Sequence, residues 1–518
     1  MRNGKHPAHA APHQLVRARG TLVLLAGAAA LAVALARFAV HVETFAFTAR
    51  MFDLGIYRDG GLIVRHTYHF RSGRSTPLYD WVSPGGGNPF TYPPFAAGIF
   101  ALMSYLPLPA LQWGMTAASL AALVTAVWLT IGAVDGPSGR ARAGLALAVS
   151  ALALWTQPVQ SNLALGQINL LLMVAIIWDL RPSAKGALGA PGRTVDRWWT
   201  GAATGIAAGI KLTPLIFIPY LLVTRRFRAA ATAAVTFAAT VAIAFLPLPG
   251  ASAMYWGGGL FARANGSSTA NLEFYFASSW NQSLRGLLSR LMLHADLATG
   301  PWLMAALVTA VAGLLCAAWL HNDGYPMLGV LACALTGLLI SPISWLHHWV
   351  WVAAWLAATF AMALRARGAA RWAWLGITAL VTLAFVDLPR LPLLRVGGQG
   401  LDLVTNVPRK HPLAWHGLEI IGGNIFVLAG LAGLAALFGW GIVRAFQPAR
   451  TVAANPLTAG PLTAGSHTAG PLTTGSHTAD PLTTGPLTAS SPAAPGAAEP
   501  SEFWRGDSGP EVMTYRGD

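Results

Sequence analysis

Long apolar segments follow one another along most of the chain, separated by short polar gaps. The first runs from Thr21 to Val40, and the clearest of the later ones lie at 110–134, 229–249, 301–320 and 417–443. Each is close to the roughly 20 residues that a helix needs to cross a bilayer. With the shorter apolar stretches included, the pattern predicts an all-α, polytopic integral membrane protein with about ten to twelve transmembrane helices.

The composition supports this interpretation and excludes a soluble protein. Of the 518 residues, 54% are hydrophobic and only 10% are charged, whereas a soluble domain carries about 25% charged residues. The net charge of +15 comes from basic residues in the short gaps between apolar segments. That distribution is typical of membrane topology and not of a nucleic-acid surface, so we expect membrane lipids around the protein and no nucleic-acid partner.

The distribution of Arg predicts which loops face the cytoplasm. Residues 1–19 are polar and basic, so we expect a cytoplasmic N-terminal segment and an uncleaved first helix, with a signal peptide as the alternative. Arg-rich gaps at 225–228 and 365–371 indicate the same side. The polar and aromatic region 43–90 is then extracytoplasmic, where we expect short helices on the membrane surface. It belongs to a membrane domain that covers residues 20–446.

The C-terminal part, residues 447–518, differs in composition from the membrane domain. Residues 455–489 consist of five-residue repeats rich in Pro, Thr and Gly, such as Pro461-Leu-Thr-Ala-Gly465. These repeats contain little apolar surface to bury. We therefore expect a disordered tail that serves as a linker or tether.

One apolar stretch, 200–223, is interrupted by Lys211-Leu-Thr-Pro214. Proline breaks a helix, and a charge among apolar residues is tolerated where it lines a protein or water cavity. We interpret the stretch as two half-length helices that meet at Lys211. The alternative is one kinked helix whose lysine reaches the membrane surface.

The acidic residues of the membrane domain gather at the predicted outer face, where chemistry is therefore expected. Those at or beyond the outer ends of apolar segments are Glu43, Asp53, Asp59, Asp80, Glu273, Asp387 and Asp402. Asp53 lies shortly after the first apolar segment, close to the membrane plane. Its carboxylate is suited to take a proton from a sugar hydroxyl, but a helix N-cap or a salt bridge to Arg58 would explain it equally well.

Six short motifs carry a resemblance to a known family. In chain order they are Phe52-Asp-Leu-Gly-Ile-Tyr57, Phe90-Thr-Tyr-Pro-Pro94, Gly166-Gln-Ile-Asn169, Lys211-Leu-Thr-Pro214, Asn281-Gln-Ser283 and Ser341-Pro-Ile-Ser-Trp-Leu-His-His-Trp349. Each motif is weak alone. Together, over about residues 20–445, they resemble glycosyltransferase family 87 (DUF2029), whose members have the GT-C membrane fold and use polyprenyl-phosphate sugars.

The resemblance implies a catalytic base at Asp53. It also points to His347 and His348, which would open a helix beside the active cavity and bind the donor phosphate or a sugar hydroxyl. Adjacent helical residues differ by about 100° in direction, so only one of them is expected to face the cavity. The alternative for this motif is an interfacial aromatic belt around Trp345 and Trp349.

The donor also requires cations, because charge develops on the departing phosphate as the sugar leaves. Lys211 is the best candidate, and Arg58 is a weaker one because it also neutralises nearby acids. Four amides, either orienting sugar hydroxyls or packing helices, complete the candidate site: Gln167, Asn169, Asn281 and Gln282. The outer loops contain no DxD pattern, so we expect no metal and no cofactor beyond the lipid-linked donor.

The resemblance finally implies an activity. We expect a multi-pass plasma-membrane enzyme, active on the extracytoplasmic side, that transfers mannose from polyprenyl-phosphate-mannose to a cell-envelope glycolipid or lipoglycan. Inversion would give an alpha linkage, with alpha-1,2 favoured. Two alternatives stay open: an arabinofuranosyltransferase that uses polyprenyl-phosphoarabinose, and a transporter or flippase of polyprenyl-linked lipids.

Overall fold

The computed structural model describes residues 11–49, 51–69, 77–81, 89–182, 196–258, 276–292, 298–386 and 418–445. The chain divides into two units, Met1–Pro448 and Ala449–Asp518, and every described residue belongs to the first. The tail at 447–518, expected to be disordered, lies outside the described residues. So do residues 1–10 of the expected cytoplasmic segment.

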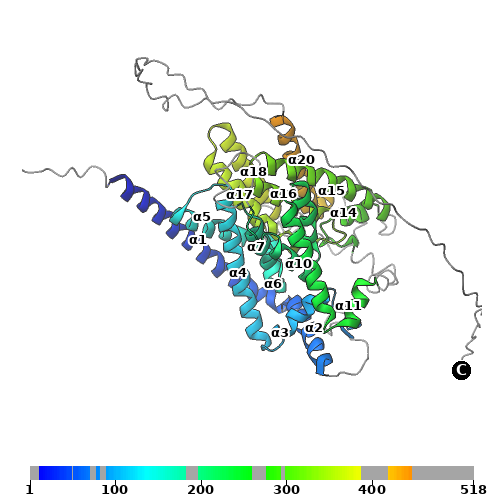
Figure 1. The fold of residues 1–518 in the computed structure, drawn as a ribbon. Helices are drawn as coiled ribbons and strands as arrows, with labels where there is room; N and C mark the ends of the chain where they lie inside the picture. Colours follow the sequence, from blue (N-terminus) through cyan, green and yellow to red (C-terminus); the bar gives the residue numbers. More distant parts are fainter. Residues whose placement is uncertain are drawn as a thin grey trace, which may run out of the picture. The chain divides into compact units, whose positions relative to one another are not determined.

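The described residues form helices joined by short connections (Figure 1). In chain order the α-helices are α1 (Ala11–Ala49), α2 (Phe52–His69), α3 (Pro94–Met103), α4 (Leu108–Ala133), α5 (Gly139–Ala153), α6 (Gln157–Leu165), α7 (Asn169–Leu180), α8 (Ala202–Ile210), α9 (Phe217–Val223), α10 (Phe227–Phe245), α11 (Pro249–Trp256), α14 (Leu284–Leu291), α15 (Thr299–Asn322), α16 (Pro326–Ile340), α17 (Val352–Arg365), α18 (Ala369–Phe385), α19 (Leu418–Gly422) and α20 (Ile425–Ala445). Three 3-10 helices join them: η1 (Pro77–Tyr79), η2 (Thr213–Ile216) and η3 (Leu346–Trp351). The described parts of the chain contain isolated β-bridges but no β-strand, so the all-α class is confirmed.

The spans confirm a multi-pass membrane protein, but fewer are of full length than the apolar pattern predicted. Among the described residues, six helices are long and apolar enough to cross a membrane, or seven if α6 and α7, which are bent by 116°, form one span. Four further apolar helices have only 10–17 residues. The apolar runs are interrupted by Gly166 and Pro214, which divide them into pieces shorter than a bilayer.

The N-terminal part differs from the expectation in two respects. Helix α1 begins at Ala11 and ends at Ala49, so it includes part of the expected cytoplasmic segment and extends past Val40. Among the described residues of 43–90, the 18-residue helix α2 replaces the expected short helices over 52–69, between the end of α1 and the 3-10 helix η1. Met51, with a φ of 50°, separates α1 from α2. This positive φ marks the turn that places Asp53 in the first turn of α2.

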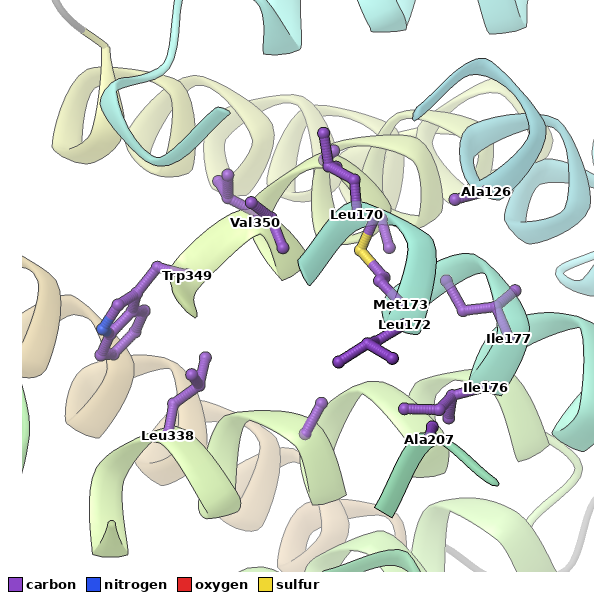
Figure 2. Close-up of a cluster of buried hydrophobic side chains, with 14 of the residues drawn as sticks. Ala126, Leu170, Leu172, Met173, Ile176, Ile177, Ala207, Leu338, Trp349 and Val350 are labelled. Atoms are coloured by element: carbon purple, nitrogen blue, oxygen red, sulfur yellow. The ribbon is translucent and has the colours of Figure 1, made fainter. Parts of the chain in front are cut away.

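Helix α7 lies within the apolar core. Its side chains are buried on several faces, and Figure 2 shows Leu170, Met173 and Ile176 directed toward neighbouring helices. The surrounding elements α4, α8, α16 and η3 contribute buried residues to the same cluster: Ala126, Ala207, Leu338, Trp349 and Val350. A helix that is apolar on all sides is stable only inside a protein or a membrane. The position of α7 therefore places the residues at its N-terminus inside the helix bundle.

Helices α1 and α5 pack with their backbones in contact. A Cβ atom on Gly27 would lie 2.0 Å from the carbonyl oxygen of Gly144, and a Cβ atom on Gly144 would lie 2.3 Å from that of Val23. Lipid tails are as apolar as the side chains, so membrane helices associate through close backbone packing at small residues. The two glycines permit that approach.

We expect Gly144→Leu to separate α1 from α5 and to lower the stability of the purified protein by about 1–3 kcal/mol, the usual cost of overpacking. Thermal unfolding in detergent measures the change. Gly114→Leu is the matched control, because a Cβ atom on Gly114 of α4 meets nothing within 4 Å. Equal melting temperatures for the two variants would contradict the proposed contact.

Candidate active site

The break between α6 and α7 presents the first polar residues of the site. Helix α6 ends at Leu165 and is capped by Gly166, whose φ of 68° is left-handed, and α7 begins at Asn169. A Cβ atom on Gly166 would lie 2.7 Å from Cβ of Leu54 in α2. Glycine therefore serves both the left-handed turn and the close approach of α2. As a result, Gln167 lies beside the first turn of α2.

Asp53 points from that turn toward Gln167. Its Oδ2 accepts a hydrogen bond of 2.7 Å from Nε2 of Gln167. Within the described structure Asp53 forms neither an ion pair with Arg58 nor a capping hydrogen bond, the two structural alternatives that the sequence left open. Burial raises the pKa of the Asp53 carboxyl, while the hydrogen bond from Gln167 and the charge of Lys211 lower it.

Two tyrosines bind the other end of the Gln167 amide. The hydroxyl oxygens of Tyr57 and Tyr92 lie within donating distance of Oε1, at 2.7 Å and 3.2 Å. The two hydroxyl oxygens are 2.7 Å apart. Sequence reasoning gave neither tyrosine a role, although each closes one of the six motifs or lies within it. Their positions in these motifs were the only sequence feature that could have indicated a role.

Lys211 lies at the C-terminal end of α8, where the helix is interrupted before η2. This confirms the break predicted at Lys211. Its Nζ donates to Oδ1 of Asn169 at 2.7 Å and lies 3.1 Å from Nε2 of His348. The amide of Asn169 also donates to Oδ1 of Asn162 at 3.2 Å. Asp53, Gln167, Asn169, Lys211 and His348 therefore lie in one small region.

The histidine motif follows the end of α16, as predicted. His348 reaches Lys211, whereas the ring of His347 is buried and its carbonyl oxygen accepts from Asn169 at 3.0 Å. Only one of the two histidines therefore contacts the lysine. An ammonium group can only donate, so with Lys211 protonated His348 is neutral and accepts at Nε2. Trp349 is 2% exposed and packs on Phe385 and Phe426, which argues against an interfacial aromatic belt.

Asn281 and Gln282 lie outside this network, and their amides bind backbone groups. Asn281 donates to the carbonyl of Pro342 at 3.1 Å and accepts from the amide of Ser344 at 2.9 Å. Gln282 donates to the carbonyl of Gly423 at 2.8 Å. This geometry favours a helix-packing role for Asn281 and Gln282 over the orientation of sugar hydroxyls. Arg58 is half-buried and contacts no member of the network among the described residues.

A cavity lies beside the network between α7, η2, α16 and η3. Asn169 and His348 contribute polar groups to its wall. The rest of the lining is mainly apolar and includes Leu172, Met173, Phe217 and Leu338. In the parts of the chain that the structure covers, no three His, Cys, Asp or Glu side chains are grouped to hold a metal ion. The expected absence of a metal cofactor stays a prediction.

A carboxylate that can accept a proton and a lysine that can bind an anion thus lie together inside a polytopic helical membrane protein. This combination, next to an apolar cavity, is typical of a membrane glycosyltransferase that uses a lipid-linked phosphosugar. The chain belongs to glycosyltransferase family 87, whose family profile matches residues 90–342. The matched region contains Gln167, Asn169 and Lys211, and Asp53 precedes it.

Curated relatives support the family membership along most of the chain. A polyprenol-phosphate-mannose-dependent alpha-(1-2)-phosphatidylinositol pentamannoside mannosyltransferase of Mycobacterium tuberculosis (strain CDC 1551 / Oshkosh) is 34% identical over 76% of this chain and 81% of its own. The protein of that name from Mycolicibacterium smegmatis is 33% identical over 68% and 80%. A polyprenol-phosphate-mannose-dependent alpha-(1-2)-phosphatidylinositol mannoside mannosyltransferase of Mycobacterium tuberculosis (strain ATCC 25618 / H37Rv) is 32% identical over 67% and 79%. No solved structure matches this chain.

The geometry predicts that Asp53→Asn removes most of the turnover. An amide has the shape of the carboxylate but cannot accept the proton, and general base catalysis contributes about 10²- to 10⁴-fold. Turnover of the purified variant is measured with the lipid-linked donor, and its elution from a sizing column controls for folding. A variant that keeps more than about a tenth of wild-type turnover would show that Asp53 is not the base.

Proposed function

We propose that the enzyme transfers mannose from polyprenyl-phosphate-mannose to a phosphatidylinositol mannoside or a similar envelope glycolipid, and forms an alpha-(1-2) linkage with inversion. The observation that carries the proposal is the juxtaposition of Asp53 and Lys211 through Gln167 and Asn169. The names of the mycobacterial relatives support the sugar, the linkage and the acceptor class.

Asp53 acts in this proposal as the general base. The acceptor hydroxyl attacks the anomeric carbon of the donor and passes its proton to the carboxylate. The new bond joins the acceptor oxygen to the sugar as the bond between the sugar and the phosphate breaks. The electron pair of that bond leaves with the polyprenyl phosphate. Attack from the face opposite the phosphate inverts the anomeric centre, so a beta-linked donor gives an alpha-linked product.

Lys211 binds the departing phosphate. Its ammonium group has three donors, and contacts to Asn169 and His348 account for two of them in the described structure. The third is left for a phosphate oxygen. Within a low-dielectric bundle this charge is worth more than it would be in water, and it stabilises the phosphate as negative charge develops. His348 and Asn169 hold the ammonium group in place.

The apolar cavity accounts for the lipid portion of the donor. Its wall begins with Asn169 and His348, both bonded to Lys211, and continues over apolar side chains of α7, η2 and α16. A phosphate bound at Lys211 therefore places the first part of a polyprenyl chain against apolar surface. We propose that the site opens on the extracytoplasmic side and that the lipid-linked sugar replaces any separate cofactor.

The proposal is tested by incubating purified protein with labelled polyprenyl-phosphate-mannose and a phosphatidylinositol mannoside acceptor, and in parallel with polyprenyl-phosphoarabinose. We expect a mannosylated product whose new linkage is alpha-(1-2) by glycosidase digestion and NMR. A site that binds particular hydroxyl groups rejects a sugar lacking them, so one donor should dominate. Transfer of arabinofuranose alone would refute the assignment of mannose as the transferred sugar. Lipid movement without a new glycosidic bond would favour the transporter.

Loss of the cation gives a second prediction. Lys211→Met should lower turnover by about 10²- to 10³-fold, as does removal of other groups that stabilise transition-state charge. Lys211→Arg keeps the charge in a different shape and should retain more activity. Initial rates at saturating acceptor measure both variants. Wild-type turnover in Lys211→Met would exclude the phosphate-binding role.

A further inference from the structure

We propose that Gln167 is a positioning residue for Asp53, and that Tyr57 and Tyr92 act through Gln167 by fixing which end of its amide meets the carboxylate. The proposal deepens the proposed function, on which it rests for the role of Asp53 as base. This role differs from both alternatives that the sequence left open for Gln167, the orientation of sugar hydroxyls and helix packing.

The orientation of the Gln167 amide follows from its partners. A side-chain amide has an oxygen that only accepts and a nitrogen that only donates. An ionised carboxylate only accepts, so the nitrogen faces Oδ2 of Asp53 and the oxygen faces the hydroxyls of Tyr57 and Tyr92. The two hydroxyls are 2.7 Å apart and have one proton each, so together they supply at least one hydrogen bond to the amide oxygen and stabilise this orientation. A flipped amide would place two acceptor oxygens at the 2.7 Å separation now held by a hydrogen bond. That arrangement is repulsive while Asp53 is ionised.

The two tyrosines are themselves held rigidly. Tyr57 is fully buried and stacks on Phe100, with ring centroids 4.4 Å apart. Tyr92 meets Tyr57 edge-on at 5.0 Å, and its carbonyl accepts from the hydroxyl of Tyr79 at 2.9 Å. The carbonyl of Gln167 also accepts from the amide of Asn162 at 3.0 Å. Neither the hydroxyls nor the glutamine can therefore move freely.

The two oxygens of the Asp53 carboxylate have different roles in this arrangement. Oδ2 is occupied by Gln167, whereas Oδ1 has no hydrogen-bond partner among the described residues. We assign Oδ1 as the oxygen that receives the proton from the acceptor. A carboxylate held at one oxygen loses its rotational freedom, so its second oxygen keeps a fixed direction toward the attacking hydroxyl.

The hydrogen bond from Gln167 also lowers the pKa of Asp53. Burial raises the pKa of Asp53 and the bond from Gln167 lowers it, so loss of the bond raises the pKa further. The titratable groups that face Asp53 are Lys211, Tyr57 and Tyr92. A base acts only when deprotonated. Loss of the bond therefore moves the acid limb of the rate profile to higher pH.

The test compares Tyr57→Phe combined with Tyr92→Phe, which keeps both rings and removes both hydroxyls, with Gln167→Met, which keeps the length and removes the amide. For both we expect kcat to fall about tenfold or more, KM for the donor to stay within about twofold, and the acid limb of kcat/KM to move to higher pH. Tyr220→Phe is the matched control. It removes a fully buried hydroxyl that binds His321, outside the site, and should leave the acid limb unchanged.

A second measurement reads the protonation of Asp53 without turnover. Dicyclohexylcarbodiimide reacts with protonated carboxyl groups, so the labelling of Asp53, followed by mass spectrometry against pH, should have a higher midpoint in both variants than in the wild type. Unchanged midpoints would overturn the proposal even if kcat falls, because a purely structural role would lower kcat alone. Failure of the wild type to transfer mannose would instead refute the proposed function and leave the labelling result valid.

Discussion

Burial of a carboxylate and an ammonium group inside a membrane bundle is the constraint on which the site depends. Each charge loses its hydration, and their attraction offsets that loss only if the remaining polar atoms are satisfied. Gln167 and Asn169 satisfy part of each charged group in series: Asp53 binds Gln167, the Asn169 amide lies 3.5 Å from the Gln167 oxygen, and Lys211 binds Asn169. Two neutral amides thus connect the opposite charges and keep them from forming a direct ion pair.

Broken helices make this arrangement possible. An intact helix uses its backbone polar groups internally and presents only side chains, whereas a break within the bundle exposes side chains that follow the turn. Gln167 lies in the break between α6 and α7, Lys211 in the break between α8 and η2, and His348 after the break between α16 and η3. Three interruptions from distant parts of the chain meet at one place. Two of the four shorter apolar helices, Thr213–Val223 and Pro326–Ile340, adjoin these breaks, so part of the shortfall in full-length spans accompanies the site.

The sequence predicted these features to different degrees. Apolar length alone indicated the helical membrane fold, and Pro214 with its charged neighbour indicated the break at Lys211, because both signals are local. The roles of Gln167 and Asn281 were not separable, since both are amides in short polar motifs. Their difference lies in their partners: a carboxylate for Gln167 and backbone groups for Asn281. Tyr57 and Tyr92 are 35 residues apart, and only the packing of α2 against α3 brings their hydroxyls together. The proximity of the two hydroxyls therefore could not be predicted from the sequence.

A second group of buried polar residues, Asn281, Gln282, Arg290 and Asn424, fixes the connection that carries His348. The amides of Asn281 and Gln282 bind the backbone around Ser344 on one side and near Gly423 on the other. Arg290 is buried behind them and donates to the side-chain oxygen of Asn424 at 2.9 Å. These contacts join the connection before η3 to the start of α20. Because His348 lies only four residues after Ser344, fixing that connection fixes where its imidazole meets Lys211. The two amides that lie outside the network therefore still determine where His348 contacts Lys211.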